Sequence, residues 1–591
     1  MDSGNRGSKT TGKGEIMGAT KRFGARLVAG GVLLAAALLW TSGTVQAQVS
    51  TRVAGGNLSI ASFLQADWAF STSGRSSPYN AHDLSSDGNT WNQMAYRGES
   101  LVDYSLDNSL ATALGLDSAR LFAQPRLYVD LGPEVDGSLK EVNLFGGRNG
   151  GRYPGNGWMA QTVGTHEYVL DAKEVFADLR KGPWKLRLGK QQIAWGTALF
   201  LRSLDAVNSL DLRRHSIFDV IGNEYADERI GMWTAHLTYE IPKVTEGVSG
   251  TSVSAFISPD FEPFILPAAG GSYNILPSQV ILNDGANIAQ ARHKLVYGGV
   301  AKATVFDVDF TANFVSTPNT LGVFSFAPAY GPNAVPGSPF IVDPNRGFNS
   351  LGDFVSAAKT ARLSVPDIAT TLMTPPFSVP AALLGDPVAL DNFLRSTPVD
   401  GVVTRQYPRE FIYGGSASYY VQPIHTFPGA QLINGNLFKL EGTYTPSKAF
   451  TTPGLSVTPK RVGELNMAIE MEKQVKWNRR IPSAFVVLEY WFKSRSDFFN
   501  RYEPAQGESN FQLIGIAMQQ GLWGNRIRLD NSLVMDVTSS VGTWLQPGIL
   551  YKPRDYLQFD LYYNYFQGGS HDIFGPLASF DEIFFKTTYK F

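Results

Sequence analysis

The chain has 591 residues, of which 12% are aromatic and only 17% are charged, and its formal net charge is −1. Because there is no basic surplus to neutralise phosphates, the composition argues against nucleic acid as the main partner. The absence of cysteine excludes disulfides, thiolate metal sites and cysteine nucleophiles.

The amino-terminal segment has the features of an export signal. Basic residues precede an apolar run over residues 27–40, and a Val-Gln-Ala triplet ending at Ala47 puts small residues where a signal peptidase needs them. The competing interpretation is a membrane anchor, but the run is short for a helix that must cross about 30 Å of hydrocarbon. We therefore predict a signal peptide over residues 1–47 and a mature chain over residues 48–591.

Segments of alternating polarity recur along the mature chain. They cover residues 58–70, 184–188, 306–314, 438–444, 527–537 and 557–565. A strand points alternate side chains to opposite faces, so each segment has one apolar and one polar face. An antiparallel sheet of a soluble protein gives the same pattern. A transmembrane barrel gives it as well, with lipid on one side of the wall and a wet lumen on the other.

The polar faces, together with a mixed-sign charged segment over residues 202–229, supply candidates for the lumen wall and its constriction. These candidates are Lys185, Arg187, Gln191, Arg202, Asp205, Arg213, Arg214, Asp307, Asp309, Lys439, Glu441, Arg526, Arg528 and Asp530. The charged segment either folds inward and shapes the pore, or it is a solvated loop held by ordinary salt bridges.

Residues 317–410 break the alternation. Proline is dense there, and short stretches of helical character lie between the prolines. Apolar residues recur, so the segment is not a solvated linker. We expect a partly helical insert, extracellular or lumenal, that folds over or into the barrel mouth; the alternative is a flexible surface loop. Its candidates for an apolar path are Leu372, Met373, Phe377, Leu383 and Leu384.

The last nine residues form an amphipathic strand. Its faces assign Phe585, Tyr589 and Phe591 to lipid and Lys586 and Lys590 to the lumen. An aromatic terminal residue is typical of the closing strand of Gram-negative outer-membrane barrels, and barrel-assembly machinery is the expected partner of that strand. The alternative is an amphipathic edge strand of a soluble sheet.

These observations together predict an all-β fold. We expect a single transmembrane antiparallel β-barrel of about 16 strands, with 14 to 18 plausible, surrounded by the lipid of the Gram-negative outer membrane. No later window offers about 18 uninterrupted apolar residues that would make a spanning helix instead.

Three passages carry a family resemblance. The first is Leu-Arg-Leu-Gly-Lys-Gln-Gln-Ile-Ala-Trp-Gly over residues 186–196, followed by Asp-Ala-Val-Asn-Ser-Leu-Asp over residues 205–211. The second is Phe-Glu-Pro-Phe-Ile-Leu-Pro-Ala-Ala-Gly over residues 261–270. The third is Gln-Pro-Gly-Ile-Leu-Tyr-Lys-Pro over residues 546–553.

These passages resemble a Gram-negative outer-membrane β-barrel family that is catalogued as a domain of unknown function. The resemblance covers roughly residues 95–591, and Ser209 with Leu210 stands where the family tends to have proline. Members are often encoded beside a periplasmic lipid-carrier-like protein and an RND-type exporter of lipids or hydrophobic compounds. The resemblance therefore implies these two partners and a part in moving such molecules, and it supplies no catalytic residue.

The residues do not predict an enzyme. None of the seven histidines lies in a metal-type pair, and no serine and histidine can be assigned to a nucleophilic triad. We predict no catalytic residue, no metal and no cofactor. The predicted function is passage of hydrophobic or amphipathic small molecules or lipids across the outer membrane. The alternatives are a general porin for small solutes and a structural barrel that docks a periplasmic carrier or exporter.

Overall fold

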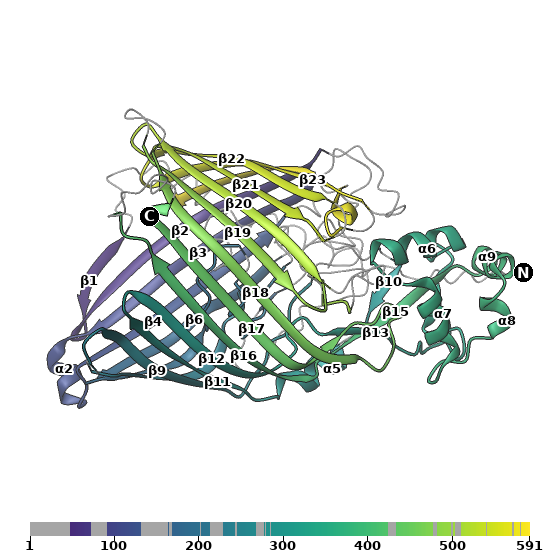
Figure 1. The fold of residues 1–591 in the computed structure, drawn as a ribbon, viewed down its shortest axis with the longest axis horizontal. Coiled ribbons are helices and arrows are strands. Elements are labelled where there is room, and N and C mark those ends of the chain that lie inside the picture. The colour runs from purple at the N-terminus through teal and green to yellow at the C-terminus, as the bar shows by residue number, and fades with distance from the viewer. Residues whose placement is uncertain are drawn as a thin grey trace, which may run out of the picture. The chain divides into compact units, whose positions relative to one another are not determined.

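The structure is a computed structural model of the chain (Figure 1). It describes residues 48–72, 91–131, 163–164, 168–200, 202–212, 229–242, 245–266, 277, 279–283, 285–423, 433–476, 482–497, 500–502, 510–538, 541–569, 572–578 and 581–591. The predicted signal peptide over residues 1–47 lies outside the described residues.

The principal sheet closes on itself to form a barrel (Figure 1). Of its 20 described strands, β1 (Val49–Val53) pairs only with β2 and β5 (Val163–Gly164) only with β6, which leaves 18 in the wall. Each wall strand pairs antiparallel with two neighbours, and β24 pairs with β2 to close the circle. Closure leaves the wall without an edge strand.

The wall strands are β2 (Gly56–Ser71), β3 (Trp91–Leu106), β4 (Ser118–Asp130), β6 (Tyr168–Lys181), β7 (Trp184–Gln191), β8 (Met232–Glu240), β9 (Val248–Ser258), β11 (Val296–Val305), β12 (Val308–Pro318), β16 (Arg409–Tyr420), β17 (Asn436–Phe450), β18 (Lys460–Val475), β19 (Ala484–Lys493), β20 (Phe511–Leu522), β21 (Ile527–Asp536), β22 (Gly542–Arg554), β23 (Leu557–Gln567) and β24 (Glu582–Lys590).

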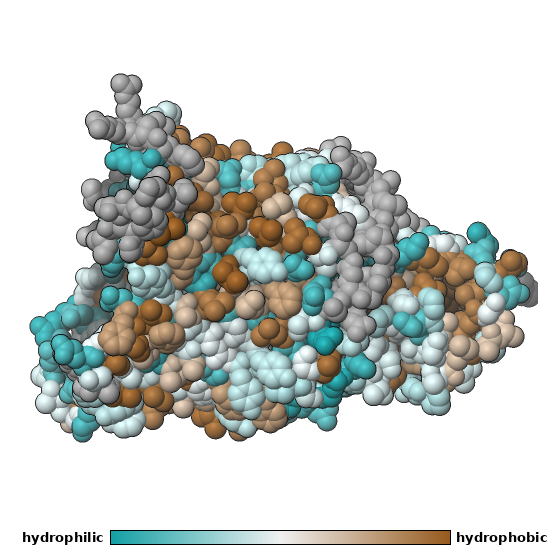
Figure 2. All heavy atoms as spheres, viewed as in Figure 1, coloured by the Kyte–Doolittle hydropathy of each residue, from teal (hydrophilic) through white to brown (hydrophobic). Residues whose placement is uncertain are grey.

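The polarity of this wall is the reverse of that in a soluble barrel. Exposed side chains on its outer face include Leu121, Leu188, Val253, Phe310, Tyr413, Leu440, Ile469, Leu488, Ile549, Leu561 and Ile583. Buried side chains on its inner face include Gln65, Asp67, Arg97, Glu99, Arg126, Thr443, Glu470, Gln546, Asn564 and Thr588. Figure 2 shows apolar residues spread over the strands in view. Such a wall suits lipid outside and polar contents inside.

The closing strand follows the same division. Phe585 lies opposite Leu561, whose side chain is 45% exposed on the outer face. Lys586 lies opposite Asp67, which is buried on the inner face. The alternation of the last residues therefore matches the two faces of the wall.

The two ends of the barrel differ in their connections. At the end where β2 begins and β24 stops, three hairpins turn in two residues, at 182–183, 306–307 and 555–556. At the other end the connections include residues 192–231, 259–295 and 319–408. We call these the turn end and the loop end. Short turns on one side and long loops on the other are typical of transmembrane barrels.

The count of 18 strands corrects the expected value of about 16 and lies at the upper limit of the expected range. The two-residue hairpins at the turn end leave more of the chain for strands than longer connections would. In addition, β22 contains Pro547 and Gly548, so its sequence does not alternate cleanly.

The insert between β12 and β16 is a folded unit with its own core. Its helices are α6 (Leu351–Thr360), α7 (Val365–Met373), α8 (Ala381–Leu384) and α9 (Pro387–Ser396). A small sheet centres on β15 (Val399–Gln406), which pairs with β10 (Val280–Leu282), β13 (Val323–Phe326) and β14 (Phe340–Val342). The helical character agrees with the expectation, whereas the sheet was not foreseen.

Local chemistry explains where these helices begin. The side chains of Ser350 and Ser364 each accept a backbone N–H in the first turn of α6 and α7, and Asp386 caps α9 in the same way. Proline stands in the first turn of α7 and α9, where its missing N–H does no harm.

The remaining described helices are short. They are α2 (Asn108–Ala113), α5 (Gly285–Arg292) and the 3-10 turn η3 (Gly575–Leu577). Within the described ranges, no helix is long and apolar enough to cross a membrane.

We predict that Gly189→Ala destabilises the barrel. Gly189 has a φ of 134°, and an added Cβ would lie 2.2 Å from the carbonyl oxygen of Val175 and 2.7 Å from the Cα of Phe176. Strain of this kind costs on the order of 1–3 kcal/mol. The temperature at which half of the protein is unfolded should be lower in this variant. It is measured from the difference in electrophoretic mobility between the folded and the unfolded barrel. In the matched variant Gly442→Ala the nearest atom would be 3.6 Å away, so an equal fall in both variants would contradict the prediction.

Candidate functional site

The connection after β7 begins with a loop that folds on itself; we call its described residues, 192–200 and 202–212, the lumen loop. The Asp205 carboxylate accepts the backbone N–H groups of Trp195 and Gly196, both at 2.8 Å. The side-chain oxygen of Asn208 accepts a further backbone N–H at 2.6 Å. Short Asp and Asn side chains are suited to such bonds because they reach nearby backbone without large loss of rotamer freedom.

Three glutamates on the wall hold the tip of this loop. We call Glu441, Glu470 and Glu489 the glutamate ladder; they lie on β17, β18 and β19 and are at most 1% exposed. Four consecutive backbone N–H groups, those of residues 197–200, donate to it. Glu441 accepts the first two, Glu470 the third at 2.5 Å and Glu489 the fourth at 2.8 Å.

The glutamate ladder lies across the lumen from the strand that leads into the loop. The wall strands β8, β9, β11, β12 and β16 separate β7 from β17. A chain that leaves β7 and binds β17, β18 and β19 from inside must therefore cross the lumen. Of the two interpretations of the charged segment, the inward fold applies to its described beginning, residues 202–212.

The ladder and the loop depend on each other electrostatically. Glu470 and Glu489 are direct cross-strand partners, which is unfavourable for two like charges. Lys439 pairs with Glu470 from the other side, donates to its carboxylate at 2.8 Å, and donates to the carbonyl oxygen of Thr197 at 2.8 Å. Hydrogen bonds to a charged group contribute about 1.5–3 kcal/mol each. The loop N–H groups and Lys439 thus offset the cost of burying these carboxylates.

Apolar side chains of the loop fit the wall where it carries glycine. A Cβ at Gly515 would lie 3.0 Å from the ring of Phe200, and a Cβ at Gly414 would lie 2.8 Å from a methyl group of Leu204. The buried wall residues clustered with Phe200 include Val487, Trp491, Phe511, Leu513 and Trp544. The inner wall is thus apolar in this sector and charged at the ladder.

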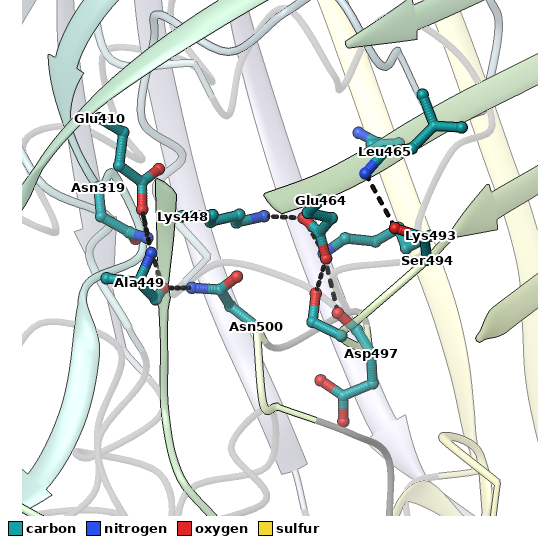
Figure 3. Close-up of polar contacts among 12 residues, drawn as sticks. Asn319, Glu410, Lys448, Ala449, Glu464, Leu465, Lys493, Ser494, Asp497 and Asn500 are labelled. Carbon is teal, nitrogen blue, oxygen red and sulfur yellow. Dashed lines mark hydrogen bonds and ion pairs between the residues drawn. The ribbon is translucent and has the colours of Figure 1, made fainter. Parts of the chain in front are cut away.

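A cavity of about 260 Å³ lies against the lumen loop on the side of the loop end. Lys448 of β17 and Lys493 of β19 approach the carboxylate of Glu464 on β18 from two sides (Figure 3). Lys448 donates a hydrogen bond to that carboxylate, and the Nζ of Lys493 is 4.0 Å from it. Asp205, Glu464 and Glu410 contribute carboxylates to the lining of this cavity. Glu410 accepts a hydrogen bond from the side chain of Asn319 at 2.8 Å.

Beside the cavity, a buried ion cluster joins the β19–β20 connection to the insert. The Asp497 carboxylate pairs with Arg501 at 2.6 Å and with Arg362 of the insert at 3.6 Å. Burial opposes ionisation of Asp497, but the two guanidinium groups outweigh it and hold its pKa below the usual value. Burial also lowers the pKa of Arg501, to about 10. The cluster therefore stabilises this junction at neutral pH and loses that contribution as pH falls through the lowered pKa of Asp497.

The structure brings some of the predicted site residues together and leaves others apart. Those at or beside the lumen loop are Gln191, Arg202, Asp205, Lys439 and Glu441. Other candidates form ion pairs or hydrogen bonds elsewhere on the wall, with a residue of the same strand or of the adjacent strand. These are Lys185, Arg187, Asp309, Arg528 and Asp530. Arg213 and Arg214 lie outside the described residues.

Two candidates are not wall residues. Asp307 lies in the two-residue turn between β11 and β12, with a φ of 68°. Arg526 lies in the turn between β20 and β21. The sequence places both in strands, because the alternation of apolar and polar residues in the flanking strands continues through the turn. Aspartate tolerates the positive φ that such turns require.

The apolar candidates of the insert mostly stabilise the insert itself. Leu372 and Phe377 are 2% and 3% exposed in its hydrophobic core, and Leu384 packs against that core. Met373 is 44% exposed, and Leu383 is half-buried. Leu372 on α7 and Phe377, which follows that helix, share a core with Phe326 and Val403 of the small sheet. Both are therefore unavailable for an apolar path into the lumen.

Most of the residues that hold the loop and line the cavity are not among the candidates predicted from the sequence. The missed residues include Glu470, Glu489, Lys448, Glu464 and Lys493. A signal was present: Glu489 is the only acidic residue within the otherwise apolar run of β19. A carboxylate is rarely buried in such a strand unless a partner satisfies it.

Among the residues that the structure describes, no group of histidine, aspartate and glutamate side chains is placed to hold a metal ion.

Comparison with known proteins gives a family and distant structural likenesses. The family described as "Protein of unknown function (DUF1302)" matches residues 28–450, which confirms the predicted family resemblance. That range includes the first two of the three passages that carried the resemblance, and the third lies beyond it. No curated protein is a significant match.

Solved structures match over most of their length at low identity. Acinetobacter baumannii OccAB3 is 9% identical, with a TM-score of 0.40 and coverage of 90% of this chain and 99% of that one. Pseudomonas aeruginosa OccK5 (OpdH) is 7% identical, with a TM-score of 0.39 and coverage of 90% and 97%. Salmonella typhi OmpF, in complex with daunomycin, is 8% identical, with a TM-score of 0.34 and coverage of 92% and 100%.

We predict that Glu470→Ala loosens the tip of the lumen loop. The natural chain has no cysteine, so Ala198→Cys creates a single thiol at a position that is 1% exposed. Loss of one charge-assisted hydrogen bond of about 1.5–3 kcal/mol should raise the rate of maleimide labelling at residue 198 about tenfold or more. Glu472→Ala is the matched control, because this neighbour binds Lys439 but no described N–H of the loop. Equal labelling rates in the two variants would show that the ladder does not hold the loop.

Proposed function

We propose that this chain, which belongs to the family described as "Protein of unknown function (DUF1302)", is an outer-membrane channel whose lumen loop narrows the passage and selects amphipathic small molecules or lipids. The observation that carries the proposal is the lumen loop itself, held across the barrel by the glutamate ladder. A barrel of this size without such a loop would leave a wide aqueous passage.

The chemistry of the constriction supports an amphipathic cargo. One side of it is apolar, built from Phe200 and the wall residues clustered with it. The ladder carboxylates lie beside that apolar sector, where they accept hydrogen bonds from the loop N–H groups, and Lys439 donates to Glu470. A solute with both an apolar and a polar part can contact both sectors without leaving buried polar groups unpaired, whereas a purely polar solute cannot.

The compartment and partners belong to the same proposal. The loop end would face the exterior, since long loops are extracellular in such barrels. Export would use the predicted signal peptide over residues 1–47, and the closing strand β24 would engage the barrel-assembly machinery. A periplasmic lipid-carrier-like protein and an RND-type exporter would then pass cargo at the turn end. No step of this function requires catalysis or a cofactor.

The proposal is tested by solute uptake into liposomes that contain the purified protein. We expect hexanesulfonate and hexyltrimethylammonium, which are amphiphiles of permanent charge, to enter faster than glucose. In the double variant Glu470→Ala/Glu489→Ala the loop is released, so glucose uptake should rise several-fold and the difference should shrink. Glu472→Ala serves as the control and should behave as the natural chain.

Two outcomes would overturn this function. Equal and fast uptake of all three solutes by the natural chain, with no change in the double variant, would indicate a general porin. No uptake of any solute by either protein would indicate a structural docking barrel.

A further inference from the structure

The inner face of the wall carries a sector without polar side chains. We call the buried apolar residues of β18 to β23 that belong to one cluster the apolar stripe. They are at most 8% exposed and are Ala468, Val487, Trp491, Phe511, Leu513, Ala517, Val534, Trp544 and Phe566. The inner face of a wall that encloses only water and polar solutes is polar. The stripe therefore suits a lumen that also takes apolar groups.

The stripe extends past the tip of the lumen loop. Trp491 belongs to the stripe and also lines the cavity of about 260 Å³ that lies against the loop. Leu513 of β20 lies opposite Trp491, and Ala517, nearer the turn end, lies opposite Val487. An apolar group in the cavity thus meets Trp491 first and finds further apolar side chains along β20 on the way to the turn end.

Between Leu513 and Ala517 the stripe has a gap that the loop fills. The residue there is Gly515, which is buried and has no side chain. A Cβ added at Gly515 would lie 3.0, 3.2 and 3.3 Å from three atoms of the Phe200 ring. We call the space over Gly515 that this ring occupies the notch. Phe200 is 3% exposed, so its ring shows directly which group fits the notch: a compact apolar one of the size of a phenyl ring.

The backbone and the ring of Phe200 are held by different interactions. Its backbone N–H donates to Glu489 at 2.8 Å, and the N–H of Leu199 donates to Glu470. The ring has no polar atom and is held in the notch by apolar packing. Rotation about the side-chain torsions can therefore remove the ring from the notch while the tip of the loop stays on the glutamate ladder.

An empty notch is unfavourable, because its apolar surface would be in contact with water. A cargo that brings an apolar group of similar size covers that surface again, so the exchange of one ring for the other has a small net free energy. Binding of this kind is weak, which a passage requires because its cargo must also leave. A purely polar solute covers no apolar surface and gains nothing by displacing the ring.

We propose that the notch is a binding site for the apolar body of the cargo, and that Phe200 is its resident occupant, which the cargo displaces. The class of cargo is an amphiphile whose apolar body is compact and has about the size of a phenyl ring. Phe200 is then a specificity-determining residue of the constriction. This inference rests on the proposed function, because it names the part of the amphiphile that the constriction recognises.

The first test compares uptake by the natural chain and by Phe200→Ala in liposomes. The probes are benzyltrimethylammonium, tetramethylammonium, which has the same head without the ring, and glucose, all far below saturation. Removing the resident ring lowers the barrier for the benzyl compound alone, so its uptake should rise at least about fivefold. Uptake of the other two should not change, because the ladder still holds the backbone of the loop.

Two outcomes of this test would overturn the inference. An equal rise for all three probes would show that Phe200 serves only to fix the loop. Unchanged uptake of benzyltrimethylammonium would show that its ring does not stand in the way of an apolar body.

The second test is a calorimetric titration of the full-length protein with benzyl alcohol in a nonionic detergent, corrected for titration into detergent alone. The natural chain should bind benzyl alcohol weakly and glycerol not at all. Phe200→Ala should bind benzyl alcohol at least about tenfold more tightly, because an emptied apolar cavity takes up small apolar molecules. Absence of binding by the natural chain, or equal affinity in both proteins, would overturn the site.

A second substitution in the Phe200→Ala background locates the site. Gly515→Val fills the notch and should abolish the gain in affinity. Gly442→Val is the matched control, since a Cβ there meets no atom closer than 3.6 Å and lies away from the notch; it should keep the gain. If Gly515→Val does not show the electrophoretic mobility of a folded barrel, Gly515→Ala replaces it and should weaken benzyl alcohol at least about threefold. Unchanged affinity in the folded variant would overturn the site.

The site and the proposed function fail separately. Binding of benzyl alcohol that depends on Gly515, in a protein that takes up no solute, would overturn the proposed function and keep the site. Faster uptake of hexanesulfonate and hexyltrimethylammonium than of glucose, without measurable binding of benzyl alcohol, would overturn the site and keep the proposed function.

Discussion

Backbone N–H groups in the middle of a barrel need acceptors, and in this protein carboxylates of the wall provide them. The tip of the lumen loop has neither a helix nor a sheet to pair with, so residues 197–200 donate to Glu441, Glu470 and Glu489 instead. An unpaired N–H buried there would cost about 1–3 kcal/mol. The path of the loop, the apolar pocket of Phe200 and the cavity beside it all follow from this set of bonds.

The arrangement also explains why the wall tolerates so much buried charge. Glu470 and Glu489 face each other across two strands and would repel if nothing bound them. The same logic recurs at Glu464 and at Asp497, where each carboxylate is shared by two cations. Buried charges of this kind are stable only as connected groups, so removing one member leaves its partners uncompensated.

Much of the wall could be predicted from the sequence because a strand has a period of two. Alternation assigned Phe585 to the outer face and Lys586 to the inner face, and it signalled a closed barrel. Alternation does not tell which strands face each other across a lumen, since that depends on strand count and closure. For this reason Glu441 was found as a polar-face residue, while its role as an acceptor for Thr197 and Ala198 was not.

In the insert, too, the sequence does not reveal which elements pack against each other. Its helices could be expected from capping residues and short apolar stretches, but the partner of an apolar helix face cannot be read from the helix alone. Leu372 and Phe377 are apolar enough to line a path for apolar solutes, but they are buried in the core of the insert. Strand β10 of the small sheet in that core belongs to the β9–β11 connection and not to the insert.

The glutamate ladder has a consequence for the order in which the molecule assembles. The bonds between the loop tip and the ladder join residues that are 243 to 289 positions apart in the sequence. Contacts of such long range form late, because the chain between them must first be ordered. A barrel whose strands β17 to β19 are not yet in place has nowhere to dock the loop. The constriction made by the lumen loop is therefore one of the last features to form. A partly assembled barrel encloses a passage that the loop does not yet narrow.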